Sequence, residues 1–336
     1  MDRQAWRRGD SSRERPSRMM LATAHGVPVV PRRVIRDVES GARPLRVLVA
    51  RGMSGSTTTT SPEPTVGQVI AGRYRVERLL GEGGFASVYL ARHVELDTPV
   101  ALKRMHPQHL TRDDLQSRFR SEARTAATLE SRHTVRVRDF GFDESGAPFM
   151  VMDLVRGPTL ETVLETRGPL NDVTVARIAL GVLASLGEAA EHGVIHRDIK
   201  PANIFLAEDK ESGSLVAKVG DFGIAKLINS GEANATRTID GVLCTPQYAA
   251  PEMLLRAPAP ASDLYSLGHV LAELLDGRAP YESDNAILSA SMHLSSEVVP
   301  LGERTRSSLL EEVVARAVSK SLDQRYVSAR EMAEAV

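Results

Sequence analysis

The sequence predicts an α+β chain in two lobes that enclose a cleft, with an antiparallel sheet and one helix first and a mainly helical body after them. Three observations predict it. Short strand patterns, separated by glycines and by a polar turn, occupy residues 74–103. One amphipathic helical pattern follows at residues 112–130, and beyond Gly157 the apolar positions recur mostly at helical spacing. A cleft between two such lobes is a common ligand site.

The elements follow in chain order from their apolar periods. We expect strands over residues 74–80, 87–92 and 100–103, with a turn at 95–99, and then the helix over 112–130. The C-terminal part is expected to hold helices over residues 171–192, 263–276 and 308–318, a helix end and short strand at 191–195, and an apolar strand at 215–219. These ranges define the two lobes.

Length, charge and cysteine content limit the class of protein. The 336 residues fit one two-lobed domain or two ordinary domains. The formal net charge of −1 does not indicate a nucleic-acid binder. One cysteine, Cys244, excludes an internal disulfide and a cysteine-built metal site, and it fits a reducing cytoplasm. No apolar run approaches the ~18 residues that cross a bilayer, so we expect a cytoplasmic protein without a membrane span.

Residues 1–71 are predicted to be a disordered arm. Arginines are frequent before residue 60, and the serine- and threonine-rich tract at 54–62 buries too little apolar surface to offset its chain entropy. Two interpretations stay open. The segment is a linker or an upstream extension with Met53 as the true start, or it is a functional basic arm.

A glycine-rich segment at residues 81–88 lies between the first two predicted strands. Glycines let backbone N–H groups approach anionic oxygens, so the segment is typical of a loop that covers phosphates. A dinucleotide-binding fold needs a helix directly after the glycines, whereas a strand pattern follows here. A plain glycine turn remains the alternative, and Ala86 stands where a third glycine is usual.

A cation and an acid stand at the two ends of the next pair of elements. Lys103 ends an apolar strand, where a buried cation needs a partner, and Glu122 lies nineteen residues later in the predicted helix. An ion pair between the strand and the helix is one interpretation, and a solvent-facing lysine is the other.

The run at residues 196–203 combines an acid, Asp198, with Lys200 and Asn203 in one loop. Phosphoryl transfer needs a carboxylate to orient the attacking hydroxyl, a cation for the migrating charge and an oxygen ligand for Mg²⁺. Eighteen residues after Asn203, Asp221 follows an apolar strand, and an acid at a strand exit suits a divalent cation. The sequence therefore predicts a phosphoryl-transfer site.

Together these motifs resemble the eukaryotic-like, Hanks-type serine/threonine protein kinases of bacteria over about residues 72–336. The resemblance implies a two-lobed protein kinase-like fold, with the N-lobe at about 72–152, the C-lobe at about 156–336 and the ATP cleft between them. It implies transfer of the γ-phosphate of ATP to serine or threonine hydroxyls of proteins, with Mg²⁺ or Mn²⁺ as the metal.

The resemblance also implies roles for single residues. Asp198 is expected to be the catalytic base, Lys200 to stabilise the transferred phosphoryl group, Lys103 to hold the ATP phosphates and Glu122 to fix Lys103. Met152 is the expected gatekeeper of the hinge. The residues expected around the nucleotide are Leu80, Gly81, Glu82, Gly83, Gly84, Phe85, Ala86, Val88, Ala101, Lys103, Met152, Asp153 and Val155.

Four further matches concern the metal and the C-lobe. Asn203 and Asp221 are the expected metal ligands. Residues 250–252 resemble the end of an activation segment, whose Glu252 is expected to pair with Arg325. Asp263 resembles the buried aspartate that braces the catalytic loop.

The activation segment offers candidate phosphorylation sites at Thr236 and Thr238, where a phosphate could pair with Arg197. An unregulated polar loop is the alternative. Thr245 is a third threonine of this segment, and the resemblance implies that Thr245 and Lys200 go with serine/threonine rather than tyrosine specificity.

Two other function classes are weighed against this one. A pseudokinase that only binds partners needs a missing catalytic element, and none is missing here. A kinase-like small-molecule phosphotransferase usually lacks the segment at residues 250–252. The expected partners are protein substrates, and a homodimer that phosphorylates itself in trans is a further option.

Overall fold

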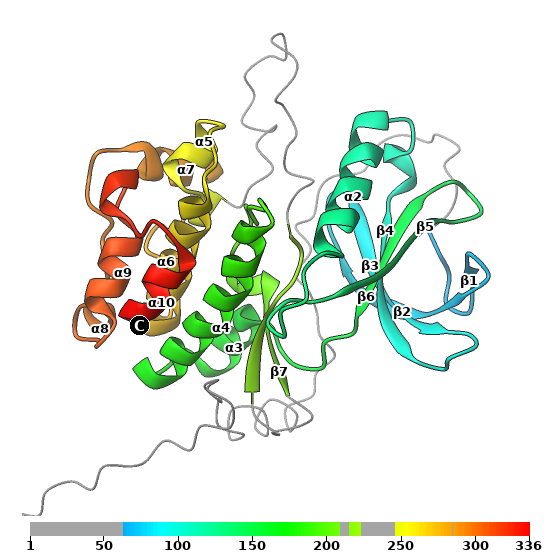
Figure 1. Ribbon diagram of the computed structural model, residues 1–336, viewed down its shortest axis with the longest axis horizontal. Helices are drawn as coiled ribbons and strands as arrows, with labels where there is room; N and C mark the ends of the chain where they lie inside the picture. The colour runs from blue at the N-terminus through cyan, green and yellow to red at the C-terminus, as the bar shows by residue number, and fades with distance from the viewer. Residues whose placement is uncertain (1–62, 209–214, 223–245, 284) are drawn as a thin grey trace, which may run out of the picture.

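The computed structural model describes residues 63–208, 215–222, 246–283 and 285–336. Figure 1 shows two lobes, a sheet with one helix and a helical body, as the sequence predicts. The predictions for the arm over residues 1–62 and for Thr236, Thr238, Cys244 and Thr245 fall outside the described residues.

The N-lobe is a six-stranded antiparallel sheet in the order β1-β2-β3-β4-β6-β5. Its strands are β1 Val69–Ile70, β2 Tyr74–Glu82, β3 Ala86–His93, β4 Pro99–Met105, β5 Val137–Phe142 and β6 Pro148–Asp153. Strands β2, β3 and β4 confirm the three predicted ones, whereas β1, β5 and β6 were not predicted. Helix α2, Asp113–Ala126, confirms the expected helix but ends four residues earlier.

Side-chain alternation along β4 gives the sheet two different faces. Ala101 and Met105 pack with Phe119 of α2 in one apolar cluster. Leu102 belongs to a second cluster on the opposite face, which includes Tyr89 of β3. Lys103 is two residues after Ala101, so its side chain lies on the same face of the sheet, the one that packs against α2.

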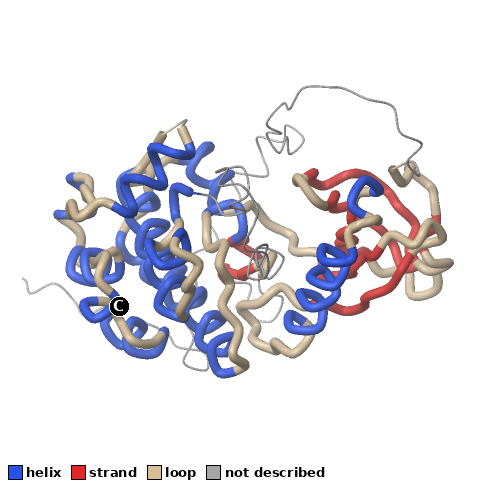
Figure 2. Tube along the Cα trace, turned by 90° about the horizontal axis from the view of Figure 1, so that it is seen from above, coloured by secondary structure: helices blue, strands red, loops and turns tan. Residues whose placement is uncertain are grey.

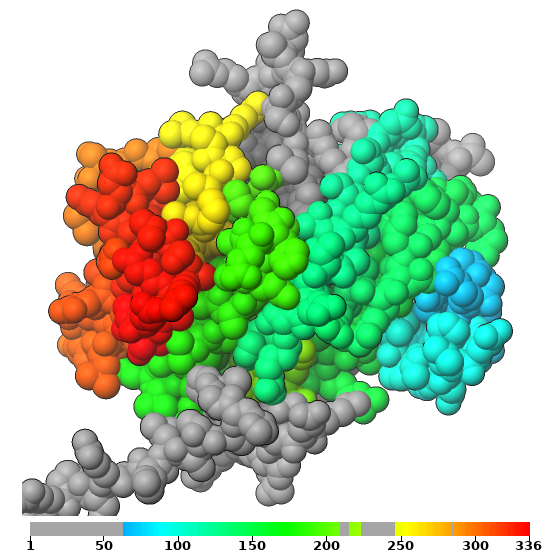
Figure 3. Space-filling view, in the orientation of Figure 1, coloured from blue at the N-terminus to red at the C-terminus, as the bar shows by residue number. Residues whose placement is uncertain are grey.

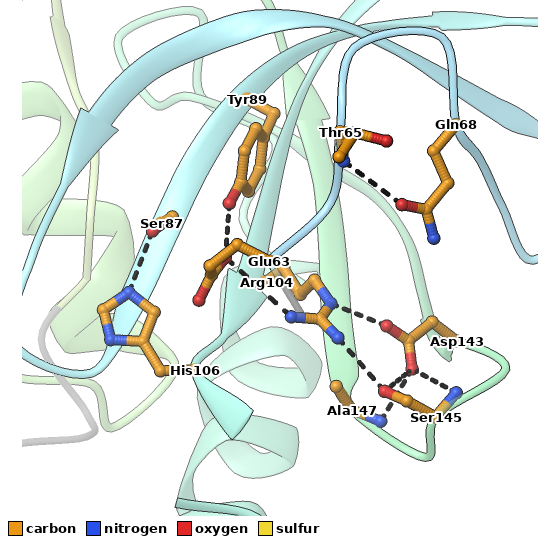
Figure 4. A network of polar contacts seen from close by, with 10 residues as sticks. All are labelled: Glu63, Thr65, Gln68, Ser87, Tyr89, Arg104, His106, Asp143, Ser145 and Ala147. Carbon is orange, nitrogen blue, oxygen red and sulfur yellow. Dashed lines mark hydrogen bonds and ion pairs between the residues drawn. The ribbon is translucent and has the colours of Figure 1, made fainter. Parts of the chain in front are cut away.

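The face of the sheet opposite α2 is covered by the chain that precedes β2. Glu63 accepts a hydrogen bond from the Tyr89 hydroxyl at 2.5 Å, and Ile70 is fully buried. Figure 4 shows Glu63 beside Arg104, whose guanidinium Nε donates to Asp143 at 2.6 Å. Residues just before the predicted boundary at 72 thus pack against the sheet, and a strand as short as β1 leaves no period in the sequence.

The C-lobe consists of helices around one apolar core, with a small β-hairpin facing the N-lobe (Figure 2). Its elements are α3 Leu160–Arg167, α4 Asp172–Glu191, β7 Ile204–Glu208, β8 Leu215–Val219, α5 Pro251–Leu254, α6 Pro260–Asp276, α7 Ala286–Leu294, α8 Glu303–Arg306, α9 Glu311–Ala317 and α10 Ala329–Ala335. Of the helix end and short strand expected at residues 191–195, the helix end is confirmed, and the strand is not formed because irregular chain follows α4. The helix expected over 308–318 is the shorter α9.

Helix α4 is the one described helix whose length and composition would allow it to cross a membrane. Its side chains Ile178, Val182 and Leu186 are buried in the core of the C-lobe. The Asn171 side chain accepts a hydrogen bond from the Thr174 N–H, which caps the helix and fixes its start. The helix ends at Glu191, and the loop that holds the motif at residues 196–203 follows it.

Candidate active site

Three charged side chains meet where the lobes join, and they come from three separate elements. Lys103 of β4 places its Nζ 3.1 Å from Oε1 of Glu122 on α2 and 3.0 Å from Oδ1 of Asp221, which follows β8. The ion pair between strand and helix is therefore confirmed, and Asp221 is an added partner. Burial alone would lower the pKa of Lys103, but the two carboxylates outweigh it and hold that pKa above its ordinary value.

The loop at residues 196–203 is held from below by Asp263 of α6. Its two carboxylate oxygens accept the backbone N–H groups of His196 at 2.6 Å and Arg197 at 2.8 Å. Burial raises the pKa of Asp263 to about 7, although the two N–H donors act in the opposite direction. Asp263 is thus placed as the bracing role implied by the resemblance requires, with hydrogen bonds to two successive residues of the loop.

His196 links this loop to the segment before Asp221. Its Nε2 lies 3.0 Å from the Gly220 carbonyl oxygen, and its Nδ1 lies 3.2 Å from the backbone N–H of Asp198. Because a carbonyl can only accept and an N–H can only donate, the ring is neutral with its proton on Nε2. Sequence reasoning missed this role, which depends on a contact across twenty-four positions.

The acid, the cation and the amide of the loop converge on one carboxylate. Lys200 Nζ lies 3.2 Å from Oδ2 of Asp198. Asn203 donates its Nδ2 amide to the Asp198 carbonyl oxygen at 2.8 Å and to Oδ2 at 3.0 Å. Both contacts fix the rotamer of Asp198, as a group that orients a hydroxyl requires. The structure therefore brings the three predicted residues together.

Asn203 and Asp221 are joined through the backbone, since the Gly220 N–H donates to the Asn203 carbonyl oxygen at 2.9 Å. Asp221 has a φ of 54°, in the left-handed region, and Lys103 beside it holds the pKa of its carboxyl below the usual range. Amide and carboxylate oxygens are the hard ligands that Mg²⁺ prefers. The described residues contain no group of three or more metal-ligating side chains, so Mg²⁺ here would also need phosphate or water oxygens.

The glycine-rich segment is the turn of the β2–β3 hairpin, as predicted. Gly83 N–H donates to the Ala86 carbonyl oxygen at 3.0 Å. A Cβ added at Gly84 would meet no atom within 4 Å, so packing within the chain does not explain the glycine there. This open space fits a ligand that approaches the backbone. Ala86 starts β3 with an ordinary φ, so the position that lacks the third glycine carries no strain.

The apolar residues expected around the nucleotide form one cluster under this hairpin. Ala101 of β4 lies opposite Met152 of β6, whose side chain is buried. Phe205 of β7 also packs there, although the sequence analysis did not include it. Members of the predicted set in this cluster are Leu80, Phe85, Ala86, Val88, Ala101, Met152 and Val155. The Asp153 side chain is instead paired with Arg138 at 2.6 Å, and its backbone N–H donates to the Arg136 carbonyl oxygen at 2.9 Å.

A buried ion pair joins the activation-segment end to the C-terminal part of the domain. Arg325 donates to both carboxylate oxygens of Glu252, at 2.7 and 3.0 Å, and Arg325 itself is 1% exposed. The Ser262 hydroxyl also donates to Glu252 at 2.6 Å. The predicted pairing of Glu252 with Arg325 is confirmed.

Comparison with known proteins agrees with this geometry. The family model described as "Protein kinase domain" matches residues 74–332. Serine/threonine-protein kinase pkn3 of Myxococcus xanthus is 39% identical over 277 residues, which are 81% of this chain and 50% of that protein. PknB of Mycobacterium tuberculosis is 35% identical over 269 residues, covering 78% of this chain and 42% of its own.

The chain thus spans half or less of these two curated relatives. Among solved structures, the PknI kinase domain of Mycobacterium tuberculosis matches with a TM-score of 0.62 and 26% identity, covering 82% of this chain and 98% of that one. The chain therefore belongs to the protein kinase family, and these matched relatives are kinases of bacteria.

Proposed function

We propose that this chain is a serine/threonine protein kinase that transfers the γ-phosphate of ATP to hydroxyl groups of proteins. The observation that carries the proposal is the arrangement around Asp198, where Lys200 and Asn203 fix the carboxylate within the same loop. The ion pair of Lys103 with Glu122 supports it, because a partly buried lysine held in this way can bind phosphate oxygens. The names of the matched relatives support the acceptor class.

Each residue then has a distinct task. Asp198 orients the acceptor hydroxyl and takes its proton, and Lys200 neutralises charge on the phosphoryl group in transit. Lys103 holds the ATP phosphates. Asn203 and Asp221 would hold Mg²⁺, which supplies positive charge to the phosphate oxygens when it is bound.

Regulation by autophosphorylation is part of the proposal. Arg197 is half-buried, and its Nε has no hydrogen-bond partner among the described residues. Burial lowers the pKa of Arg197, with Asp263 acting in the opposite direction. A phosphothreonine at Thr236 or Thr238 would add negative charge that can pair with this guanidinium. Phosphopeptide mapping of active protein is expected to find phosphate on one of them, and two unmodified threonines would contradict the proposal.

The test of the function is an assay with radiolabelled ATP, Mg²⁺ and a generic basic protein. Wild-type chain is expected to label the protein on serine and threonine, and EDTA to abolish the labelling because no Mg²⁺ remains. Labelling of tyrosine alone would contradict the acceptor class. ATP binding without any labelling would favour a pseudokinase, and labelling of only small molecules a phosphotransferase of another class.

A further inference from the structure

The connection between β4 and α2, residues 106–112, contacts the tip of the glycine-rich hairpin. His109 places its Nε2 3.1 Å from the Gly84 carbonyl oxygen, and its ring lies 5.1 Å from the ring of Phe85. One step nearer to β4, the His106 N–H donates to the Phe85 carbonyl oxygen at 2.8 Å. Two successive carbonyls of the hairpin tip are therefore held by the same short connection.

The connection is itself fixed on both sides. The buried His106 ring bonds to the buried Ser87 hydroxyl at 2.8 Å, as Figure 4 shows. At the other end, Gln116 of α2 donates its side-chain amide to the Leu110 carbonyl oxygen at 2.5 Å. His109 is half-buried on this support, and we expect its contacts with Gly84 and Phe85 to restrict the ring.

The hydrogen bond from His109 sets the direction of one peptide group. A carbonyl oxygen can only accept, so Nε2 of His109 carries the proton. In a trans peptide the C=O and N–H point in opposite directions, so Phe85 N–H points away from the β4–α2 connection. Among the described residues this N–H has no backbone acceptor. Free backbone N–H groups at such a tip bind anionic oxygens.

We propose that His109 is a positioning residue for ATP phosphates: by holding the Gly84 carbonyl, it orients the hairpin tip so that Phe85 N–H faces the nucleotide. The inference rests on the proposed function, because the anion at this tip is taken to be ATP. It also connects the tip to the helix that bears Glu122, since residues 106–112 lead directly into α2. The role belongs to binding rather than to the chemical step.

The test measures dissociation constants by calorimetry for ATP with Mg²⁺ and, separately, for adenosine. His109→Leu keeps the apolar contact with Phe85 and removes the donor, so the dissociation constant for ATP is expected to rise by about 2- to 10-fold. Adenosine has no phosphate, and its dissociation constant is expected to stay unchanged. His109→Gln retains a side-chain N–H and is expected to bind ATP within about 2-fold of wild type.

His192→Leu is the matched control. His192 Nδ1 also bonds to a backbone carbonyl, that of Glu188 at 2.9 Å, but it lies on the surface of the C-lobe. This variant is expected to bind ATP as wild type does. An unchanged ATP constant in His109→Leu, an equal loss for adenosine, or a glutamine variant as weak as the leucine variant would each overturn the role of His109.

The two proposals fail in different ways. Wild-type chain that binds ATP without transferring phosphate contradicts the kinase activity and leaves the binding comparison intact. Wild-type chain that transfers phosphate, together with a fully binding His109→Leu, contradicts the role of His109 alone. Wild-type chain that binds no ATP contradicts both.

Discussion

Replacing Arg325 with methionine removes one partner of the buried ion pair that closes the activation segment. The guanidinium donates to both oxygens of Glu252 and to the carbonyls of Ser319 and Lys320, and it lies 4.6 Å from the ring of Tyr265. Methionine fills most of the apolar volume of the stem, so the main loss is electrostatic. Removing one partner of a buried pair costs about 3–5 kcal/mol of unfolding free energy.

Thermal unfolding measured by circular dichroism tests this magnitude. At about 2–4 °C per kcal/mol for a large domain, Arg325→Met is expected to lower Tm by about 6–20 °C. Glu252→Gln should also destabilise the protein, since it leaves the guanidinium buried without a counter-charge. The double variant is expected to lose less unfolding free energy than the two single variants together, by about 0.5–3 kcal/mol. The reason is that it leaves neither charge buried without its partner.

The pair also predicts a pH dependence with a definite sign. Burial alone would raise the pKa of Glu252, but Arg325 and the Ser262 hydroxyl outweigh it and hold the pKa below the ordinary value. A depressed pKa in the folded state gives stability that is present above the unfolded value of about 4.3 and is lost as pH falls below it. Additive losses in the cycle, or a Tm unchanged in Arg325→Met, would refute the reasoning.

Three further predictions concern the site and the core. Glu122→Gln weakens the hold on Lys103, so the phosphotransfer rate is expected to fall by about 10- to 100-fold with unchanged Tm, and an unchanged rate would contradict it. Asp263→Asn leaves one catalytic-loop N–H without an acceptor, so urea unfolding should show a loss of about 1–3 kcal/mol, and no loss would show that the brace is not needed. His269 is fully buried with neither ring nitrogen partnered among the described residues, and burial lowers its pKa well below the ordinary value. Wild type therefore loses unfolding free energy as pH falls below the pKa of about 6.5 that histidine has in the unfolded chain. His269→Leu lacks this loss, so its unfolding free energy is expected to rise relative to that of wild type between pH 7 and 5. Parallel pH profiles of unfolding for the two proteins would contradict this.

Elements with a clear apolar period were predictable, and those without one were not. β3 and α2 show their buried faces in the sequence, at period two and at helical spacing. β6 is buried at five successive positions, so it shows no alternation. β5 combines charged residues with glycine and has no buried position, and β1 has only two residues.

The same distinction applies to the site. Lys103 and Glu122 lie on neighbouring elements, so the sequence offered their ion pair as one of two interpretations, and the structure shows that it forms. The bond from Lys103 to Asp221 crosses 118 positions, and only folding brings the two together. The contact of His109 with Gly84 is likewise invisible in the sequence, because nothing in the pattern of residues 106–112 says that the connection bends back onto the hairpin.

The central claim, that Asp198 orients the acceptor hydroxyl and takes its proton, is tested most directly by the rate of phosphotransfer in Asp198→Asn. Asparagine keeps the size of the side chain and cannot take the proton, so the rate is expected to fall by about 10²–10⁴-fold while ATP binding persists. Asp323→Asn, an equal change at an exposed aspartate, should leave the rate unchanged. Equal phosphate incorporation by Asp198→Asn and wild type would contradict the assignment.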